Sequence, residues 1–121
     1  MEFMALVYDD PAGWERMTEE EQASAMEGYL AVAQEATAAG ALVSGAGLAP
    51  TTAATSVRVR NGEALVTDGP YAEVKESLGG YYLFSCDSIE EAVDWAAKIP
   101  AAWHGGAIEV RAIHVDEEAA A

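Results

Sequence analysis

Two short runs of this chain are apolar on both sides of the strands that they predict. Residues 3–8, FMALVY, and residues 81–84, YYLF, place apolar or aromatic side chains at odd and at even positions alike. Successive side chains of a strand point to opposite faces, so both faces of these strands are expected to be buried. Any sheet built from them needs a covering layer on each side.

A long helix is predicted between Thr18 and Gly40. Thr18 and Glu21 form a capping-box pattern, the glutamates at 19–21 suit the positive end of the helix dipole, and Gly40 is a natural stop. Spacings of three and four residues predict one buried stripe. Its members are Met26, Tyr29, Leu30, Ala33 and Ala36.

A second helix is predicted in residues 87–100, DSIEEAVDWAAKIP. Ser88 is the expected N-cap, Glu91 would complete another capping box, and Pro100 ends the segment. The expected buried stripe consists of Ile89, Ala92, Val93 and Ala96.

The remaining segments predict strands. A weak strand is expected at 41–48 and the last strand at 107–115, and residues 56–67, SVRVRNGEALVT, predict a hairpin that turns at Asn61–Gly62. A two-residue turn there would place Arg60 opposite Glu63. The order is then β-α-β, hairpin, β-α-β, an α+β fold of the ferredoxin-like, split βαβ kind with an inserted hairpin. Residues 1–115 are expected to form one domain and residues 116–121 a disordered tail.

Two helices cover only one face of such a sheet, and the chain offers no further elements for the other. The simplest expectation is a homodimer in which two sheets pack face to face, as a dimeric α+β barrel. In the last strand Ile108 and Val110 would face the helices, whereas Glu109 and Arg111 would face the space between the sheets. That Glu–Arg pair is either a structural ion pair or a polar patch in a ligand pocket.

Composition excludes several partners and indicates a compartment. A formal net charge of −15 disfavours nucleic acid and anionic membrane surfaces. The single cysteine, Cys86, excludes an internal disulfide, indicates a reducing compartment and is expected in the core. Because the sequence has no signal-peptide pattern and no run of about 20 apolar residues, a cytoplasmic location is expected. The spacing of His104 and His114 matches no metal motif, so neither a metal nor a cofactor is predicted.

The segment 68–82, DGPYAEVKESLGGYY, is the main candidate for chemistry. Glu73 is the predicted acid–base group, beside Lys75, which with Arg111 would hold an anionic or carbonyl substrate. The segment is expected to wrap the mouth of the inter-sheet space and to bring Glu73, Lys75 or Glu76 close to Arg111 or Tyr8. The predicted substrate-binding residues are Tyr8, Asp68, Tyr71, Glu76, Tyr81, Glu109 and Arg111. The alternatives are a solvated, salt-bridged turn and tyrosines that only pack the core.

Four stretches carry a resemblance to a known family. They are LVYDD near the start, TSVRVRNGEALVTDGP, DGPYAEVKESLGGYYLF, and EEAVDWAAKIP followed by IEVRAI. On these residues the chain resembles the YCII-related proteins, and in particular the branch named for its DGPF motif, with Tyr71 in place of the phenylalanine. The resemblance implies a dimeric α+β barrel of ferredoxin-like protomers. The His–Asp pair proposed for simpler members is not carried over, because Met26 stands at the histidine position.

Two functions are compatible with these patterns. The first is a small-molecule-binding protein or small enzyme with an acid–base site between the sheets. The second is a non-catalytic accessory or sensory protein of an extracytoplasmic-function sigma-factor system, which the resemblance to DGPF-type proteins suggests. Fold alone does not decide between them, since one fold hosts many functions.

Overall fold

The computed structural model describes residues 1–72 and 75–115. Glu73, the predicted acid–base residue, and the predicted tail 116–121 lie outside the described residues. Nine helices and strands are described: β1 (Glu2–Asp9), α1 (Pro11–Arg16), α2 (Glu19–Ala38), β2 (Leu42–Gly47), β3 (Thr55–Arg60), β4 (Glu63–Asp68), β5 (Ser77–Ser85), α3 (Ile89–Ala96) and β6 (Ala107–Ala112). Two short 3-10 turns, η1 (Thr51–Ala53) and η2 (Pro100–Ala102), complete them.

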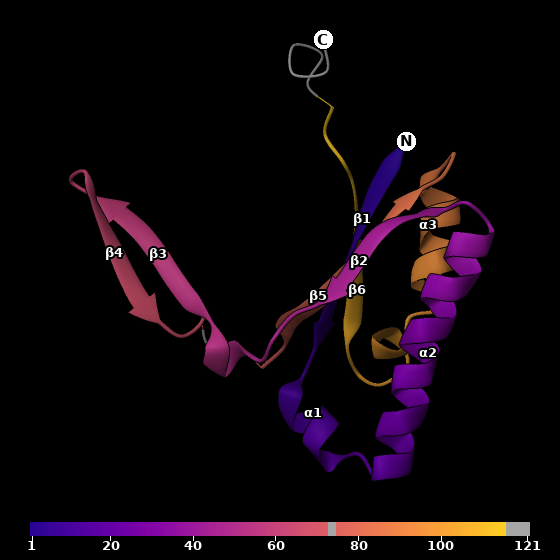
Figure 1. The fold of residues 1–121 in the computed structure, drawn as a ribbon, viewed down its shortest axis with the longest axis horizontal. Coiled ribbons are helices and arrows are strands. Elements are labelled where there is room, and N and C mark those ends of the chain that lie inside the picture. The colour runs from indigo at the N-terminus through magenta and orange to yellow at the C-terminus, as the bar shows by residue number, and fades with distance from the viewer. Residues whose placement is uncertain (73–74, 116–121) are drawn as a thin grey trace.

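Four strands form one antiparallel sheet in the order β2-β5-β1-β6. α2 and α3 lie together on one side of this sheet (Figure 1), which confirms the predicted split βαβ arrangement. No helix among the described residues is both long and apolar enough to span a membrane.

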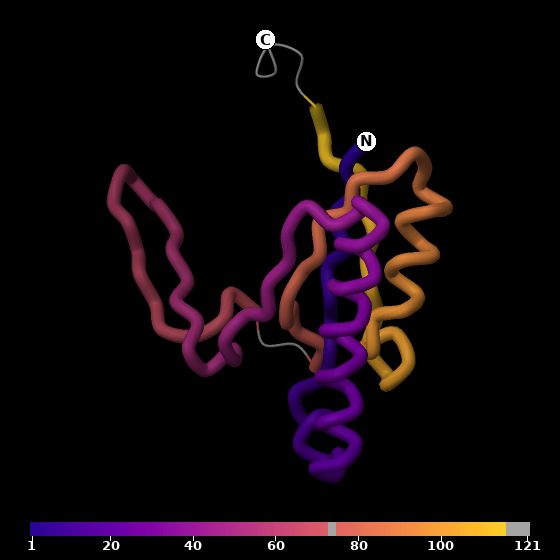
Figure 2. Tube along the Cα trace, turned by 45° about the vertical axis from the view of Figure 1, so that its right-hand side comes forward, coloured from indigo at the N-terminus to yellow at the C-terminus, as the bar shows by residue number. Residues whose placement is uncertain are grey.

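The predicted hairpin forms a separate sheet of β3 and β4. Its turn residues, Asn61 and Gly62, have φ values of 53° and 79°, the positive pair that a type I′ turn requires. Arg60 lies opposite Glu63, as predicted. The hairpin projects away from the body of the molecule (Figures 1 and 2).

The core lies between the sheet and the two helices. β1 contributes Phe3, Ala5 and Val7, all buried, while Met4, Leu6 and Tyr8 of the other face are half-buried. Phe84 of β5 is fully buried and stacks between Tyr82 and Trp95, at ring-centroid distances of 5.6 and 6.1 Å. The core therefore fills one side of the sheet only.

The predicted stripe of α2 is partly wrong. Ala25, Val32 and Ala36 are the buried residues of this helix, whereas Met26 and Leu30 remain 58% and 59% exposed. The helix is rotated so that its smaller side chains meet the sheet. Because the buried side chains of the helix are small, the aromatic side chains of β5 fill the volume between helix and sheet.

The predicted stripe of α3 is confirmed for its two alanines and wrong for its two larger residues. Ala92 and Ala96 are buried, but Ile89 and Val93 are exposed. Trp95 takes the place of these larger residues and packs against the core cluster. The pattern of α3 includes two aliphatic positions that nothing in the described chain covers.

Side chains define the starts of the three helices. The capping box of Thr18 and Glu21 is present, as predicted. Ser88 caps α3 by accepting from the Glu91 N–H, but the Glu91 carboxylate accepts from the Asp87 N–H (3.2 Å) and not from Ser88, so this second box is incomplete. α1 was not predicted, although Asp10 caps it directly before Pro11.

We predict that Gly80→Ala lowers the free energy of unfolding by about 1–3 kcal/mol, the usual range for overpacking. A Cβ at this position would lie 2.7 Å from the Ala46 carbonyl oxygen and 3.2 Å from the Gly47 Cα, both backbone atoms of β2. Gly47, its partner across the strands, has open space around its own Cβ position and is the matched control. Urea denaturation should show Gly47→Ala within about 0.5 kcal/mol of wild type. Equal losses for the two variants would contradict this account.

Candidate functional site

The helix-free face of the sheet gathers four of the predicted site residues. On β1, Leu6 lies between Tyr81 of β5 and Glu109 of β6. One step along, Met4 lies between Leu83 and Arg111. Because paired residues of neighbouring strands share a face, Tyr81, Glu109 and Arg111 join Tyr8 on this side. Tyr82 points the other way, into the core.

The predicted loop residues lie apart from that group. Asp68 ends β4 opposite Thr55, and the exposed Tyr71 ring lies under the Arg58 guanidinium, 4.6 Å from its centroid. Lys75 and Glu76 are exposed. Among the described residues, no hydrogen bond or ion pair joins either of them to Tyr8 or Arg111. The convergence of loop and sheet face therefore stays a prediction, as does the role of Glu73.

The Asp68–Gly69–Pro70 motif has a structural task at the base of the hairpin. Gly69 has a φ of 105°, which favours glycine. Its N–H donates to the Ala54 carbonyl (2.7 Å), and its own carbonyl accepts from the Ser56 hydroxyl (2.8 Å). These bonds fix the direction in which the hairpin leaves the body.

A small pocket at the end of β1 concentrates ionisable groups. It has a volume of about 40 Å³ and lies where β1, α1, α2 and η2 meet. Its polar lining comes from Asp9, Asp10, Tyr29 and His104. Its apolar lining comes from Gly13, Trp14, Met17, Ala25, Pro100 and Ala101. Mostly apolar walls with a few convergent polar groups are typical of ligand sites.

Asp9 is the best candidate for an acid–base group in this pocket. Burial raises the pKa of its half-buried carboxyl, and the nearby negative charge of Asp10 raises that pKa further. Burial also raises the pKa of the Tyr29 hydroxyl, with a further contribution from Asp9, against a smaller opposing effect of the Ala101 backbone. A carboxyl whose pKa is raised in this way, beside a tyrosine hydroxyl, can exchange a proton with a bound group.

Two features hold Asp9 and Tyr29 in place. A Cβ at Gly79 would lie 3.2 and 3.3 Å from the Asp9 carboxylate oxygens, so glycine leaves room for that carboxyl at the bulge of β5. Tyr82, whose pKa burial raises to about 12, donates its hydroxyl to the Tyr29 carbonyl (3.0 Å) and fixes α2 at this point.

A larger cavity of about 260 Å³ lies at the same end of the sheet. The DGP segment contributes Gly69, Pro70 and Ala72, and the other walls are Pro11, Thr51, Thr52 and Ser77. Ser77 is the register partner of Asp9 across β1 and β5, and Pro11 follows the Asp9–Asp10 pair. The two cavities share no lining residue, but Asp10 of the first and Pro11 of the second are consecutive in the chain at the end of β1.

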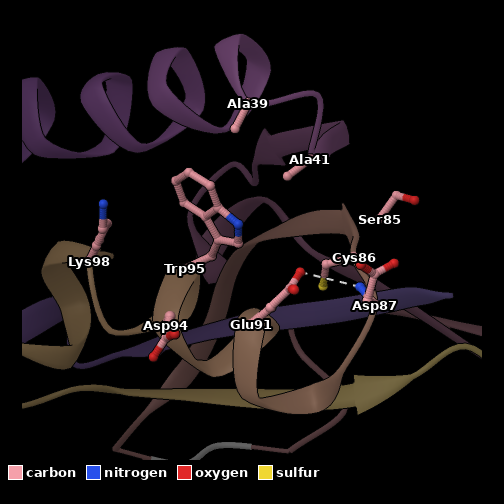
Figure 3. Close-up of a pocket in the computed structure, with 9 residues that line it drawn as sticks. All are labelled: Ala39, Ala41, Ser85, Cys86, Asp87, Glu91, Asp94, Trp95 and Lys98. Carbon is pink, nitrogen blue, oxygen red and sulfur yellow. Dashed lines mark hydrogen bonds between the residues drawn. The ribbon is translucent and has the colours of Figure 1, made fainter.

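A hollow of about 470 Å³ lies between the C-terminal end of α2 and α3 (Figure 3). Burial and the charge of Glu91 raise the pKa of the Cys86 thiol, which donates to the Ser88 carbonyl (3.6 Å) and is a poor nucleophile in this state. Lys98 is engaged with Glu35 (3.1 Å) and lies over the Trp95 ring. No group of three or more potential metal ligands occurs in the described ranges.

The sequence prediction missed Asp9, Tyr29 and His104. Tyr29 was expected only as part of a packing stripe, and His104 was considered only as a metal ligand. The available signal was the DDP sequence directly after a strand expected to be buried on both faces, which places two carboxylates at the end of that strand. What the sequence did not reveal is that α1 and η2 pack beside the end of this strand and form a pocket with it.

Comparison with known proteins places the chain in a family. The YCII-related domain matches residues 1–115. An uncharacterised protein of Rhizobium meliloti (strain 1021) is 42% identical over 96 residues, which are 79% of this chain and 77% of that protein. The structure is similar to that of the 5-chloro-2-hydroxyhydroquinone dehydrochlorinase TftG of Burkholderia phenoliruptrix AC1100, solved in complex with 2,5-dihydroxybenzoquinone. That similarity has a TM-score of 0.56 and 14% identity over 98% of both chains, and it shows the shared fold. The chain belongs to the YCII-related family.

Proposed function

We propose that this protein binds a small organic molecule and exchanges a proton with it through Asp9. The observation that carries the proposal is the half-buried Asp9 carboxyl, which lies with Tyr29 in an apolar pocket and is given room by Gly79. Burial of an ionisable group without an ion-pair partner lowers stability, and functional sites are where such groups are retained. The nearby DGP motif supports the proposal by lining the neighbouring cavity.

The size of the two cavities limits the ligand. A pocket of about 40 Å³ admits a hydroxyl, carbonyl or carboxyl group but no ring. The neighbouring cavity of about 260 Å³, with the hydroxyls of Thr51, Thr52 and Ser77, offers space for the rest of a small molecule. A planar, oxygen-substituted compound fits this description. The quinone bound to the structurally similar dehydrochlorinase is of this class and is a suitable first probe.

We also propose that the protein acts as a homodimer. The helix-free face offers Met4, Leu6 and Leu83, half-buried in the single chain, together with Tyr81. A second copy would cover them and would enclose the predicted binding residues Tyr8, Glu109 and Arg111 in the space between the sheets. In that space Arg111 would attract an anionic or carbonyl group, with Lys75 and Glu73 as the predicted contributors from the loop.

The non-catalytic role beside a sigma factor has no observation in its favour among the described residues. The pocket that holds Asp9 and Tyr29 favours binding of a small molecule over that accessory role. Membership of the DGPF branch, on which that alternative depends, remains a prediction.

We predict that Asp9→Asn stabilises the protein at neutral pH. The raised pKa means that the folded state binds the Asp9 proton more tightly than the unfolded chain does. Stability is therefore lost as the pH rises from the ordinary carboxyl pKa through the raised folded value, and Asn avoids this loss. The difference between variant and wild type in urea denaturation should be largest at pH 7 and vanish near about pH 3.

Asp10→Ala is the contrasting variant for this measurement. Asp10 caps α1 through the Ala12 N–H (3.0 Å) and lies 3.7 Å from the Arg16 guanidinium. Its removal should lower the free energy of unfolding by about 1 kcal/mol. If Asp9→Asn is destabilising at pH 7 as well, Asp9 is a structural partner and the proposed role is wrong.

A pair of tyrosine variants tests ligand binding. Tyr29→Phe removes the pocket hydroxyl but keeps the Tyr29 carbonyl that Tyr82 binds. We expect it to weaken binding of 2,5-dihydroxybenzoquinone about tenfold, as for loss of a buried hydrogen bond, with little change in stability. Tyr82→Phe should do the reverse, lowering stability by about 1 kcal/mol and leaving the affinity nearly unchanged.

Calorimetry measures the affinities, and NMR chemical-shift changes on ligand addition should appear at the backbone amides of Asp9, Tyr29 and Ala101. The proposal fails if neither this quinone nor small hydroxylated aromatic acids perturb those amides.

The proposed homodimer is tested on the helix-free face. Leu6→Glu places a carboxylate beside Glu109 at the centre of that face. We expect it to raise the dimer dissociation constant more than about tenfold, because a buried charge without a partner is unfavourable. Glu27→Gln, on an exposed position of α2, is the control. Light scattering over a dilution series gives the masses, and a wild-type protein that stays monomeric throughout would rule out the dimer.

A further inference from the structure

The β3–β4 hairpin exposes a contiguous apolar face. Its register places Val57 opposite Val66 and Val59 opposite Ala64, so these four side chains share one side of the two-stranded sheet. Val57, Val59 and Val66 are 62%, 71% and 65% exposed. The opposite side pairs Ser56 with Thr67, Arg58 with Leu65 and Arg60 with Glu63.

The hairpin is held in a defined direction without being covered. It projects from the body on the side of the sheet that carries no helices (Figures 1 and 2). Its base is tied by the bonds of Gly69 to Ala54 and Ser56. A two-stranded hairpin on its own is marginally stable in water, and it needs packing against another element. Within the described residues of its own chain, the apolar face has no such cover.

Charge indicates which molecule supplies that cover. Residues 55–68 contain Arg58, Arg60, Glu63 and Asp68, and they therefore have no net formal charge, so the formal net charge of −15 resides in the rest of the chain. Surfaces that carry this excess of acidic residues would be repelled by a second copy of the same chain. Because the hairpin has no net charge, it can approach an acidic second copy without that repulsion.

We infer that the hairpin is an arm that lies on a second copy of this chain, with Val57, Val59, Ala64 and Val66 facing that copy. The inference rests on the proposed homodimer and extends it, because the arm leaves the body on the same side as the helix-free face. In a two-fold dimer both arms make the contact, so each apolar residue contributes twice. The arm thereby buries valines that are otherwise in water and stabilises its own two strands.

The test compares the two faces of the arm. The triple variant Val57→Thr, Val59→Thr, Val66→Thr removes apolar surface but keeps β-branched residues, so the hairpin itself should persist. We expect its dimer dissociation constant, measured by sedimentation velocity over a dilution series, to rise about tenfold or more. Leu65→Thr makes the matched change on the opposite face and should leave the constant within about twofold of wild type.

A second measurement does not depend on the folding of that variant. A photo-crosslinking amino acid in place of Val59 should give a covalent dimer in the purified protein, with the crosslink between two copies. Crosslinks only within one chain would mean that the arm folds onto its own body, and the inference would be overturned. A wild-type dimer whose dissociation constant the triple variant leaves unchanged would overturn the arm alone and leave the homodimer intact. A protein that is monomeric at all concentrations would overturn both.

Discussion

A sheet that is apolar on both faces but covered on only one is the constraint on which the rest of this structure depends. Phe3, Ala5 and Val7 are buried beneath the helices, whereas Met4 and Leu6 of the same strand are only half-buried. β1 is one of the two inner strands of the sheet and pairs with both β5 and β6. The proposed second copy, the arm and the inter-sheet space are all consequences of that uncovered face.

The covered side is shaped by small residues. The helices present alanines to the sheet, and the aromatic residues Tyr82, Phe84 and Trp95 fill the volume that longer aliphatic side chains would otherwise occupy. This arrangement leaves Met26, Leu30, Ile89 and Val93 on the outside. Helical periodicity identifies a stripe to within one position, but the rotation of the helix about its axis depends on which side chains the opposing sheet can accommodate.

At the end of β1 the fold places a carboxyl where it is unfavourable for stability. Asp9 has the apolar pocket on one side and the backbone of Gly79 on the other, and Asp10 adds a like charge nearby. Neighbouring groups are arranged for structure: Asp10 caps a helix and Tyr82 holds the backbone of Tyr29. Asp9 is thus one destabilising group among stabilising neighbours. This pattern is expected where a residue is retained for function and not for stability.

Local signals in the sequence were sufficient for the strands, for α2 and α3 and for their order, but not for α1. The Thr18 capping box, the Asn61–Gly62 turn and the continuous apolar run of β1 each depend on a few neighbouring residues, so the split βαβ arrangement with its hairpin could be predicted. The same register reasoning correctly grouped Glu109 and Arg111 on one side of β6. Only the tertiary structure decided which side chains of α2 and α3 are buried, and that Asp9, Tyr29 and His104, distant in sequence, line one pocket. Those outcomes depend on how separate elements pack, and no short segment contains the residues against which it will be packed.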